Sequence, residues 1–296
     1  MTTTKPLNTG SQSTTATTTW KTAPTRTINV GGTPFAYREL GPRTGVPLVF
    51  LHHFTAVLDD WDPRVIDGIA ASRHVITFDN RGVGASGGSV PHTIDEMAAD
   101  AVAFIGALGL DQVDLLGFSL GGGVAQVITL EHPEVVRRVI LAGTGPAGGG
   151  GIERINRIAA SAYTKAALTL RDPRHFLFFN RNATGKRAAS QYMARLKERT
   201  ADRDKRISMQ ARLAQLKAIR EAGLGTPHDL SKITQPVFVA NGDNDVMVAS
   251  SHSEDLARRI PNAKLVIYPD SGHGGVFQYH REFVPEVLEF LGAASG

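Results

Sequence analysis

The chain alternates short apolar runs with longer stretches in which apolar and polar residues are mixed. Six continuous apolar runs are typical of parallel strands buried on both faces, at residues 47–52, 74–79, 113–118, 138–142, 236–241 and 264–268. Apolar positions recur at helical spacing over residues 94–108, 120–131, 251–259 and 276–291. The alternation predicts an α/β fold whose mostly parallel, doubly wound sheet carries helices on both faces.

The N-terminal part of the chain has a different pattern. Residues 25–30 and 34–40 are two further β-type runs around a Gly-Gly pair, which predicts a hairpin at the sheet edge. Before them the chain is rich in Thr and Ser, so residues 1–24 are expected to form a disordered tail. This tail lacks the apolar stretch of a secretory signal, and a cytoplasmic protein is the default expectation. No apolar run approaches the length of about 18 residues that a membrane span needs, so no membrane partner is expected.

The strand pattern stops after residue 142. Four glycines at 148–151 lead into a stretch with helical periodicity, and strand character returns only at residue 236. The glycines lack the following Lys-Ser/Thr of a phosphate-binding loop, which favours a flexible hinge. We therefore predict an all-helical cap, residues 148–235, inserted after the sixth strand into a core of residues 25–147 and 236–296. Such a cap would lie over the strand ends where open α/β sheets bind ligands.

Charge and composition narrow the possible functions. The net charge is only +4, but residues 152–235 hold 18 Lys and Arg against 7 Asp and Glu. These charges alternate with apolar residues at helical spacing, which favours a solvated helix face. No nucleic-acid-binding module accompanies them, so no nucleic-acid partner is expected, although a mild attraction for anionic substrates is compatible with the charge. The absence of cysteine excludes thiol nucleophiles and thiolate metal sites, and we expect neither a metal nor a cofactor.

The candidate catalytic residue lies in a Gly-x-Ser-x-Gly turn. The apolar run 113–118 passes through Gly117-Phe118-Ser119-Leu120-Gly121 into a helical pattern, which is the setting of a nucleophile elbow. In such a turn the central residue has a strained backbone and its side chain projects into open space. The sequence therefore predicts Ser119 to be a nucleophile.

A serine hydroxyl needs a base within hydrogen-bond reach, and the base needs an acid to orient it. After such an elbow the partners follow in the order Asp or Glu, then His. His273 follows the run 264–268 between glycines and is assigned as the general base. Asp243 and Asp245 both follow the run 236–241; we favour Asp245, which lies deeper in the loop, and Asp243 stays an alternative.

The tetrahedral intermediate of acyl transfer needs two backbone donors. One is assigned to the N–H of Leu120, at the start of the helix after the nucleophile, where the helix dipole also favours negative charge. The other should come from the loop after the run 47–52, and we assign it to the N–H of Phe54.

The chain resembles the α/β-hydrolase superfamily over about residues 25–292, and within it the capped esterase, lactonase and cofactor-free haloperoxidase group. Residues 117–123 are similar to that group's elbow, and residues 78–86 resemble its Asp-x-Arg-Gly-x-Gly-x-Ser loop, in which Asp79 is structural. A serine at the elbow tip differs from the aspartate of haloalkane dehalogenases and epoxide hydrolases.

The resemblance also bears on two site residues. In the family the acid lies three residues past the glycine of a Gly-x-x-Asp pattern, and this matches Asp245. The family's loop after the first central strand usually reads His-Gly-aromatic, and His53 replaces that glycine here. Histidine tolerates a left-handed backbone better than most residues. His53 either brings an imidazole to the pocket mouth or packs as a structural residue.

The function expected from the sequence is a serine hydrolase that cleaves a small carboxylic ester or lactone through an acyl-enzyme. One alternative keeps the triad but performs perhydrolysis with haloperoxidase activity, or hydrolyses a carbon–carbon bond. Another is a non-catalytic ligand-binding protein of the same fold. The sequence leaves the oligomeric state open, a homo-oligomer included.

Overall fold

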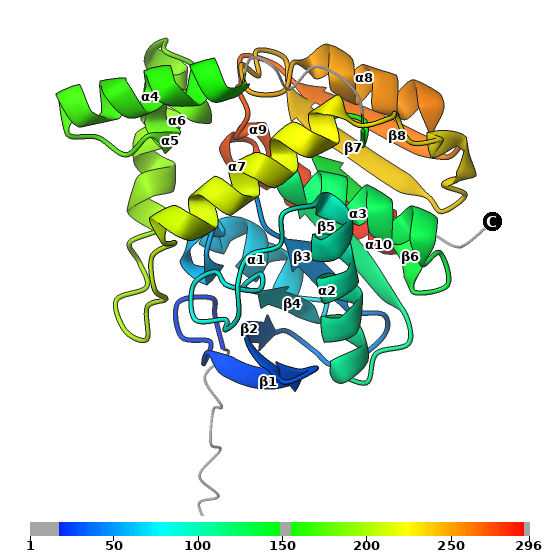
Figure 1. Ribbon diagram of the computed structural model, residues 1–296. Coiled ribbons are helices and arrows are strands. Elements are labelled where there is room, and N and C mark those ends of the chain that lie inside the picture. The colour runs from blue at the N-terminus through cyan, green and yellow to red at the C-terminus, as the bar shows by residue number, and fades with distance from the viewer. Residues whose placement is uncertain (1–17, 149–154, 293–296) are drawn as a thin grey trace, which may run out of the picture.

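The computed structural model describes residues 18–148 and 155–292 (Figure 1). Residues 1–17 of the predicted tail and three of the four glycines, 149–151, lie outside the described residues. The strands are β1 (Arg26–Val30), β2 (Thr33–Leu40), β3 (Leu48–Leu51), β4 (Val75–Phe78), β5 (Val113–Phe118), β6 (Val136–Ala142), β7 (Val237–Gly242) and β8 (Ala263–Tyr268). Each lies at a position that the apolar pattern predicts.

The eight strands form one sheet in the order β1-β2-β4-β3-β5-β6-β7-β8. β1 pairs with β2 and β2 with β4 in antiparallel fashion, whereas every pair from β4 to β8 is parallel. The strand order reverses direction around β3 and β4, which makes the sheet doubly wound. The predicted fold class and the edge hairpin are both confirmed.

Helices cover both faces of this sheet. One face carries α2 (Ile94–Ala107), α3 (Leu120–Glu131) and α8 (Ser250–Arg259), and the other carries α1 (Pro63–Ala70) and α10 (His280–Gly292). The helix predicted at 276–291 is divided into α9 (Gly275–Gln278) and α10. The pattern missed α1, which is short; the Asp62 carboxylate caps it by accepting the Arg64 N–H, and Pro63 occupies its first turn.

The parallel strands are apolar throughout because neighbouring side chains face opposite layers. In β3, Leu48 and Phe50 pack with α1 and α10, whereas Val49 and Leu51 pack with α2 and α3. All four side chains are buried. The predicted site residues follow the carboxyl ends of β3, β5, β7 and β8.

A helical insertion separates β6 from β7. It contains α4 (Ile155–Thr169), α5 (Arg174–Leu177), α6 (Ala183–Arg195) and α7 (Met209–Leu224). Figure 1 shows α4, α5 and α6 grouped together, with α7 extending from them toward α8 and β7. We call residues 155–235 the helical insertion.

Arginines of the insertion pair with a short acidic stretch that follows β3. Arg203 Nε lies 3.1 Å from Asp59 Oδ2, and Arg195 Nη2 lies 2.6 Å from Asp62 Oδ2. Arg174 forms an ion pair with Asp60, the carboxylate between them. Part of the basic charge that we expected on a solvated face therefore joins the insertion to the core.

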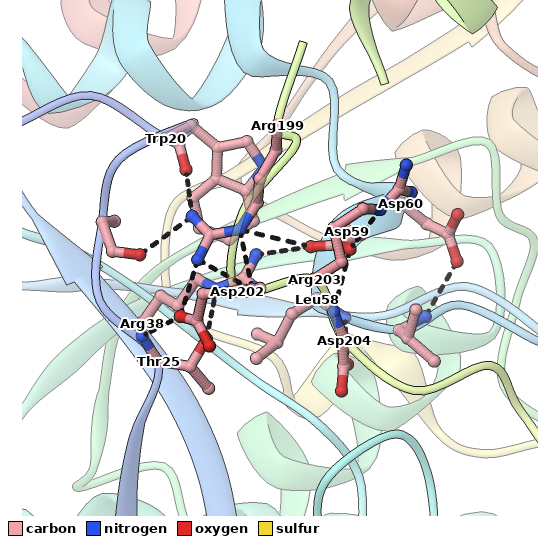
Figure 2. A network of polar contacts seen from close by, with 12 residues as sticks. Trp20, Thr25, Arg38, Leu58, Asp59, Asp60, Arg199, Asp202, Arg203 and Asp204 are labelled. Atoms are coloured by element: carbon pink, nitrogen blue, oxygen red, sulfur yellow. Dashed lines mark hydrogen bonds and ion pairs between the residues drawn. The ribbon is translucent and has the colours of Figure 1, made fainter. Parts of the chain in front are cut away.

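A buried cluster of polar contacts extends this junction to the N-terminal segment (Figure 2). Arg199 donates to the carbonyls of Trp20 and Ala23, each at 2.9 Å, and to the Asp202 carboxylate at 2.8 Å. Arg38 of β2 donates to Asp59 Oδ1 at 2.8 Å, and its guanidinium lies 5.1 Å from the centre of the Trp20 ring.

The end of the predicted tail therefore needs a correction. The Trp20 side chain is only 1% exposed. Within residues 18–24, Trp20 and Ala23 pack on the core because the indole covers the Arg38 guanidinium and because the carbonyls of these two residues satisfy a buried arginine of the insertion.

Two carboxyl groups meet in the same region. Asp79, which follows β4, is fully buried and lies within hydrogen-bond reach of Asp204 of the insertion. The Leu58 N–H donates to both of them, at 2.9 Å and 3.2 Å. Burial and the neighbouring Asp204 raise the pKa of Asp79 well above its usual range. The neutral form of Asp79 is therefore favoured in the folded protein.

This pair predicts a pH-dependent contribution to stability. Because the folded-state pKa of Asp79 is raised, its contribution is complete below the unfolded pKa and is lost as the pH rises through the folded pKa. Asp204→Asn replaces the neighbouring carboxyl group by an amide, so the pKa of Asp79 should fall toward its usual range. The difference in Tm between this variant and the wild type should therefore grow in the variant's favour as the pH rises from about 5 to about 9. A difference that is constant over this range would contradict the raised pKa of Asp79.

Candidate active site

Ser119 lies at the tip of a tight turn between β5 and α3. Its backbone has φ 56° and ψ −114°, a strained conformation for a residue with a side chain. A Cβ on Gly121 would lie 2.1 Å from the Leu51 carbonyl oxygen, and one on Gly117 would lie 2.3 Å from the Gly121 oxygen. Both positions therefore require glycine, because a side chain at either one would collide with a backbone carbonyl. The turn leaves Ser119 partly exposed although its neighbours are buried.

The structure brings His273 and Asp245 together. His273 Nδ1 lies 2.7 Å from Asp245 Oδ2, and both side chains are almost completely buried. The other Asp245 oxygen accepts the N–H groups of Met247 and Val248 at 2.7 Å and 2.9 Å. These bonds orient the carboxylate toward His273, which favours the tautomer in which His273 Nδ1 carries the proton. Nε2 is then the nitrogen that can accept a proton from another group.

The alternative acid, Asp243, has a different role. Its carboxylate accepts the N–H groups of Asp270 and Ser271 at 3.0 Å and 3.1 Å. These hydrogen bonds with backbone N–H groups lower its pKa against the opposing effect of burial. Asp243 thus fixes the loop that carries His273, whereas Asp245 contacts the imidazole itself.

The His273 ring lies beside the elbow. Its centre is 4.9 Å from that of Phe118, the residue that precedes Ser119. A Cβ on Gly143 would lie 3.3 Å from the same imidazole, and Gly143 follows Ala142, whose carbonyl accepts the Ser119 N–H at 2.9 Å. The described residues contain no hydrogen bond between Ser119 Oγ and His273. Such contacts are often long before substrate binds.

Two backbone N–H groups are candidate oxyanion donors for the site. Leu120 is the first residue of α3, so its N–H has no partner within the helix, and it lies at the positive end of the helix dipole. Phe54 lies in the loop between β3 and the 3-10 helix Leu58–Asp60, and its N–H has no acceptor within the described residues. We call residues 52–57 the β3 loop.

The left-handed position in the β3 loop is Thr55, with φ 67°, and His53 has no positive φ. The His53 ring is buried between Phe118 and Phe178, with ring centres 5.4 Å and 5.2 Å away, and its Nδ1 lies 2.8 Å from the Phe54 carbonyl oxygen. Burial lowers the pKa of His53 to about 4. Of the two roles considered for His53, the structure shows the packed one.

A cavity of about 370 Å³ opens onto Ser119 and Leu120. Its walls come from the starts of α2 and α3, the loop after β6, the end of α7 and the start of α8. The described residues that line it include Asp95, Glu221, His228 and His252, but neither Lys nor Arg. Sequence reasoning missed these wall residues because they come from segments that are distant from one another in the sequence.

The described chain, residues 18–148 and 155–292, shows no cluster of three or more His, Asp or Glu side chains that could hold a metal ion. Within the same residues, none of the helices is long and apolar enough to cross a membrane. The aromatic residues Phe178 and Phe179 of the insertion are buried in the core and do not line the Ser119 cavity.

Comparison with known proteins identifies the family to which this fold belongs. Residues 46–278 match the family model described as alpha/beta hydrolase fold, and the chain belongs to that family. It is 29% identical over 245 residues to a Rhizobium rhizogenes protein provisionally named a carbamate hydrolase, covering 79% of this chain and 88% of the relative. It is 28% identical over 272 residues to the non-heme chloroperoxidase of Streptomyces lividans, covering 88% and 96%. The solved structure of an alpha/beta hydrolase fold protein from Chitinophaga pinensis superimposes with a TM-score of 0.89 at 39% identity, covering 94% of this chain and all of that chain.

The different contacts of the two aspartates predict different effects of removing their charge. Asp245→Asn should lower kcat for an ester substrate by about 10³- to 10⁴-fold, because the imidazole loses the partner that fixes its tautomer. Asp243→Asn should leave kcat almost unchanged, because an amide oxygen can still accept a loop N–H. Steady-state kinetics of the two purified variants measures both effects. A larger loss in Asp243→Asn would assign the orienting role to Asp243.

Proposed function

We propose that the protein is a serine hydrolase that cleaves a carboxylic ester or lactone through an acyl-enzyme on Ser119. The observation that carries this proposal is the buried His273–Asp245 pair, joined at 2.7 Å beside a strained serine that opens onto a cavity. A serine, a histidine and a carboxylate in this relation form the arrangement that activates a hydroxyl for attack on a carbonyl carbon.

In the acylation step, Ser119 Oγ attacks the carbonyl carbon while His273 Nε2 takes the hydroxyl proton. The carbonyl oxygen becomes an oxyanion and accepts hydrogen bonds from the N–H groups of Leu120 and Phe54. His273 then transfers the proton to the leaving alcohol oxygen as the carbon–oxygen bond breaks. Asp245 stabilises the imidazolium throughout this step and does not take the proton.

In the deacylation step, the same groups act on water. His273 removes a proton from a water molecule, the resulting hydroxide attacks the acyl carbon, and the second oxyanion uses the same two donors. Collapse of this intermediate returns the proton to Ser119 Oγ and releases the acid. We propose that the helical insertion acts as a cap that shapes the substrate cavity, because the end of α7 forms one wall of it.

A second candidate function uses the same triad with hydrogen peroxide in place of water. The resemblance to a non-heme chloroperoxidase favours it. Attack of peroxide on the acyl-enzyme would release a peracid, which then oxidises halide in solution. Comparing peracid formation with ester hydrolysis at equal acyl donor concentration decides between the two functions.

Active-site labelling tests the proposed nucleophile. A fluorophosphonate should add once to the wild-type protein with loss of fluoride, and peptide mass spectrometry should map the adduct to Ser119. Short-chain nitrophenyl esters, with a lactone and a carbamate in the same panel, measure turnover before and after labelling. Ser119→Ala should lose the adduct and at least about 10⁴-fold in kcat, with an unchanged Tm.

Two results would contradict the proposal. One is an adduct that forms equally on wild type and Ser119→Ala, because it would place the reactive group elsewhere. The other is ligand binding to the cavity with neither adduct nor turnover, which would favour a binding protein of this fold.

A further inference from the structure

One polar side chain of the insertion is buried where it reaches the β3 loop. Gln215 of α7 is fully buried and its Oε1 accepts the Thr55 N–H at 2.8 Å. Ala211 and Ala218, one turn before and after it, are also buried and pack into the layer of α2 and α3. These small residues allow the α7 backbone to lie close to the core, so that the glutamine can reach the loop.

The hydrogen bond to Gln215 fixes the N–H end of the peptide group between Phe54 and Thr55. The other end of that peptide is the Phe54 carbonyl, which accepts the proton of His53 Nδ1 at 2.8 Å. Side chains thus hold both the oxygen and the N–H of the Phe54–Thr55 peptide. This matters because Thr55 has φ 67°, and a β-branched residue in the left-handed region is strained and needs support from its surroundings.

Packing alone does not explain a glutamine at this position. The Gln215 amide nitrogen is buried, and no acceptor for it exists within the described residues. An apolar side chain of similar length would fill the same space without burying an unpaired donor. What glutamine adds in this structure is the acceptor for the Thr55 N–H.

The fixed peptide directly follows the peptide whose N–H belongs to Phe54. The segment after the β3 loop is held by the insertion as well, through the ion pairs at Asp59, Asp60 and Asp62. The insertion therefore contacts the chain on the Thr55 side of Phe54 and again a few residues later.

We propose that Gln215 is a positioning residue that makes the oxyanion-binding conformation of the β3 loop depend on α7 being docked against the core. This inference rests on the proposed function, since it concerns the second oxyanion donor of that reaction. When α7 is docked, Gln215 accepts the Thr55 N–H and the Phe54 N–H stays in the oxyanion-binding orientation. When α7 moves away, the strained loop loses this support and the donor is misplaced.

The test compares Gln215→Met, which keeps length but removes the acceptor, with Gln210→Met, the same change at an exposed position of α7. Hydrolysis of a nitrophenyl ester gives kcat and KM, and a trifluoromethyl ketone measures affinity for a tetrahedral oxyanion. We expect Gln215→Met to lower kcat by about 10- to 100-fold with KM within about twofold. The affinity for the ketone should fall by a similar factor, while Gln210→Met matches the wild type.

A rescue variant separates positioning from general damage. Thr55→Gly in the Gln215→Met background should recover part of the lost kcat, because glycine adopts a positive φ without strain. Circular dichroism and Tm check that each variant is folded, and Gln215→Leu replaces Gln215→Met if the latter does not fold.

Three results would overturn the proposal: an unchanged kcat in Gln215→Met, a loss confined to KM, or failure of both the Met and Leu variants to fold. The last would make Gln215 a residue needed for folding alone. These outcomes are distinct from failure of the proposed function, in which the wild-type protein itself shows neither ester turnover nor a fluorophosphonate adduct.

Discussion

The site depends on how closely β5, α3 and β3 approach one another around Ser119. A serine with φ 56° is unfavourable, and it persists because the strand and helix on either side are buried and cannot move apart. Gly121 lies against the Leu51 carbonyl, so the end of β3 and the start of α3 are fixed relative to each other. The same contact sets where the β3 loop begins relative to Ser119.

The sheet and the elbow could be predicted because their signals are local. A parallel strand buried on both faces is a continuous apolar run, and β5 and α3 have the predicted bounds, Val113–Phe118 and Leu120–Glu131. The Asp245–His273 contact needed one more step, since these residues follow neighbouring strands and the carboxyl ends of parallel strands lie at one edge of the sheet. The geometry favours Asp245, because its carboxylate faces the imidazole, whereas the Asp243 carboxylate accepts backbone N–H groups.

The junction between insertion and core could not be predicted, because it joins residues distant in sequence. The pattern of α6 gives no sign that Arg195 pairs with Asp62, and the Thr-rich N-terminal sequence hides the buried Trp20. Charge counting predicted a solvated basic face, whereas three arginines pair with Asp59, Asp60 and Asp62, which lie just before α1. These three carboxylates are largely buried, so losing the arginine partner of one leaves a buried charge and weakens the contact between the insertion and the core.

We propose that Ser119 carries the acyl group during turnover. Stopped-flow mixing of the wild-type protein with excess nitrophenyl ester follows release of the first product before the acyl-enzyme is hydrolysed. We expect a rapid burst of one nitrophenolate per protein molecule, with acid-quenched protein that carries one acyl group on Ser119. Steady release without a burst, from quenched protein that carries no acyl group at any time point, would contradict it.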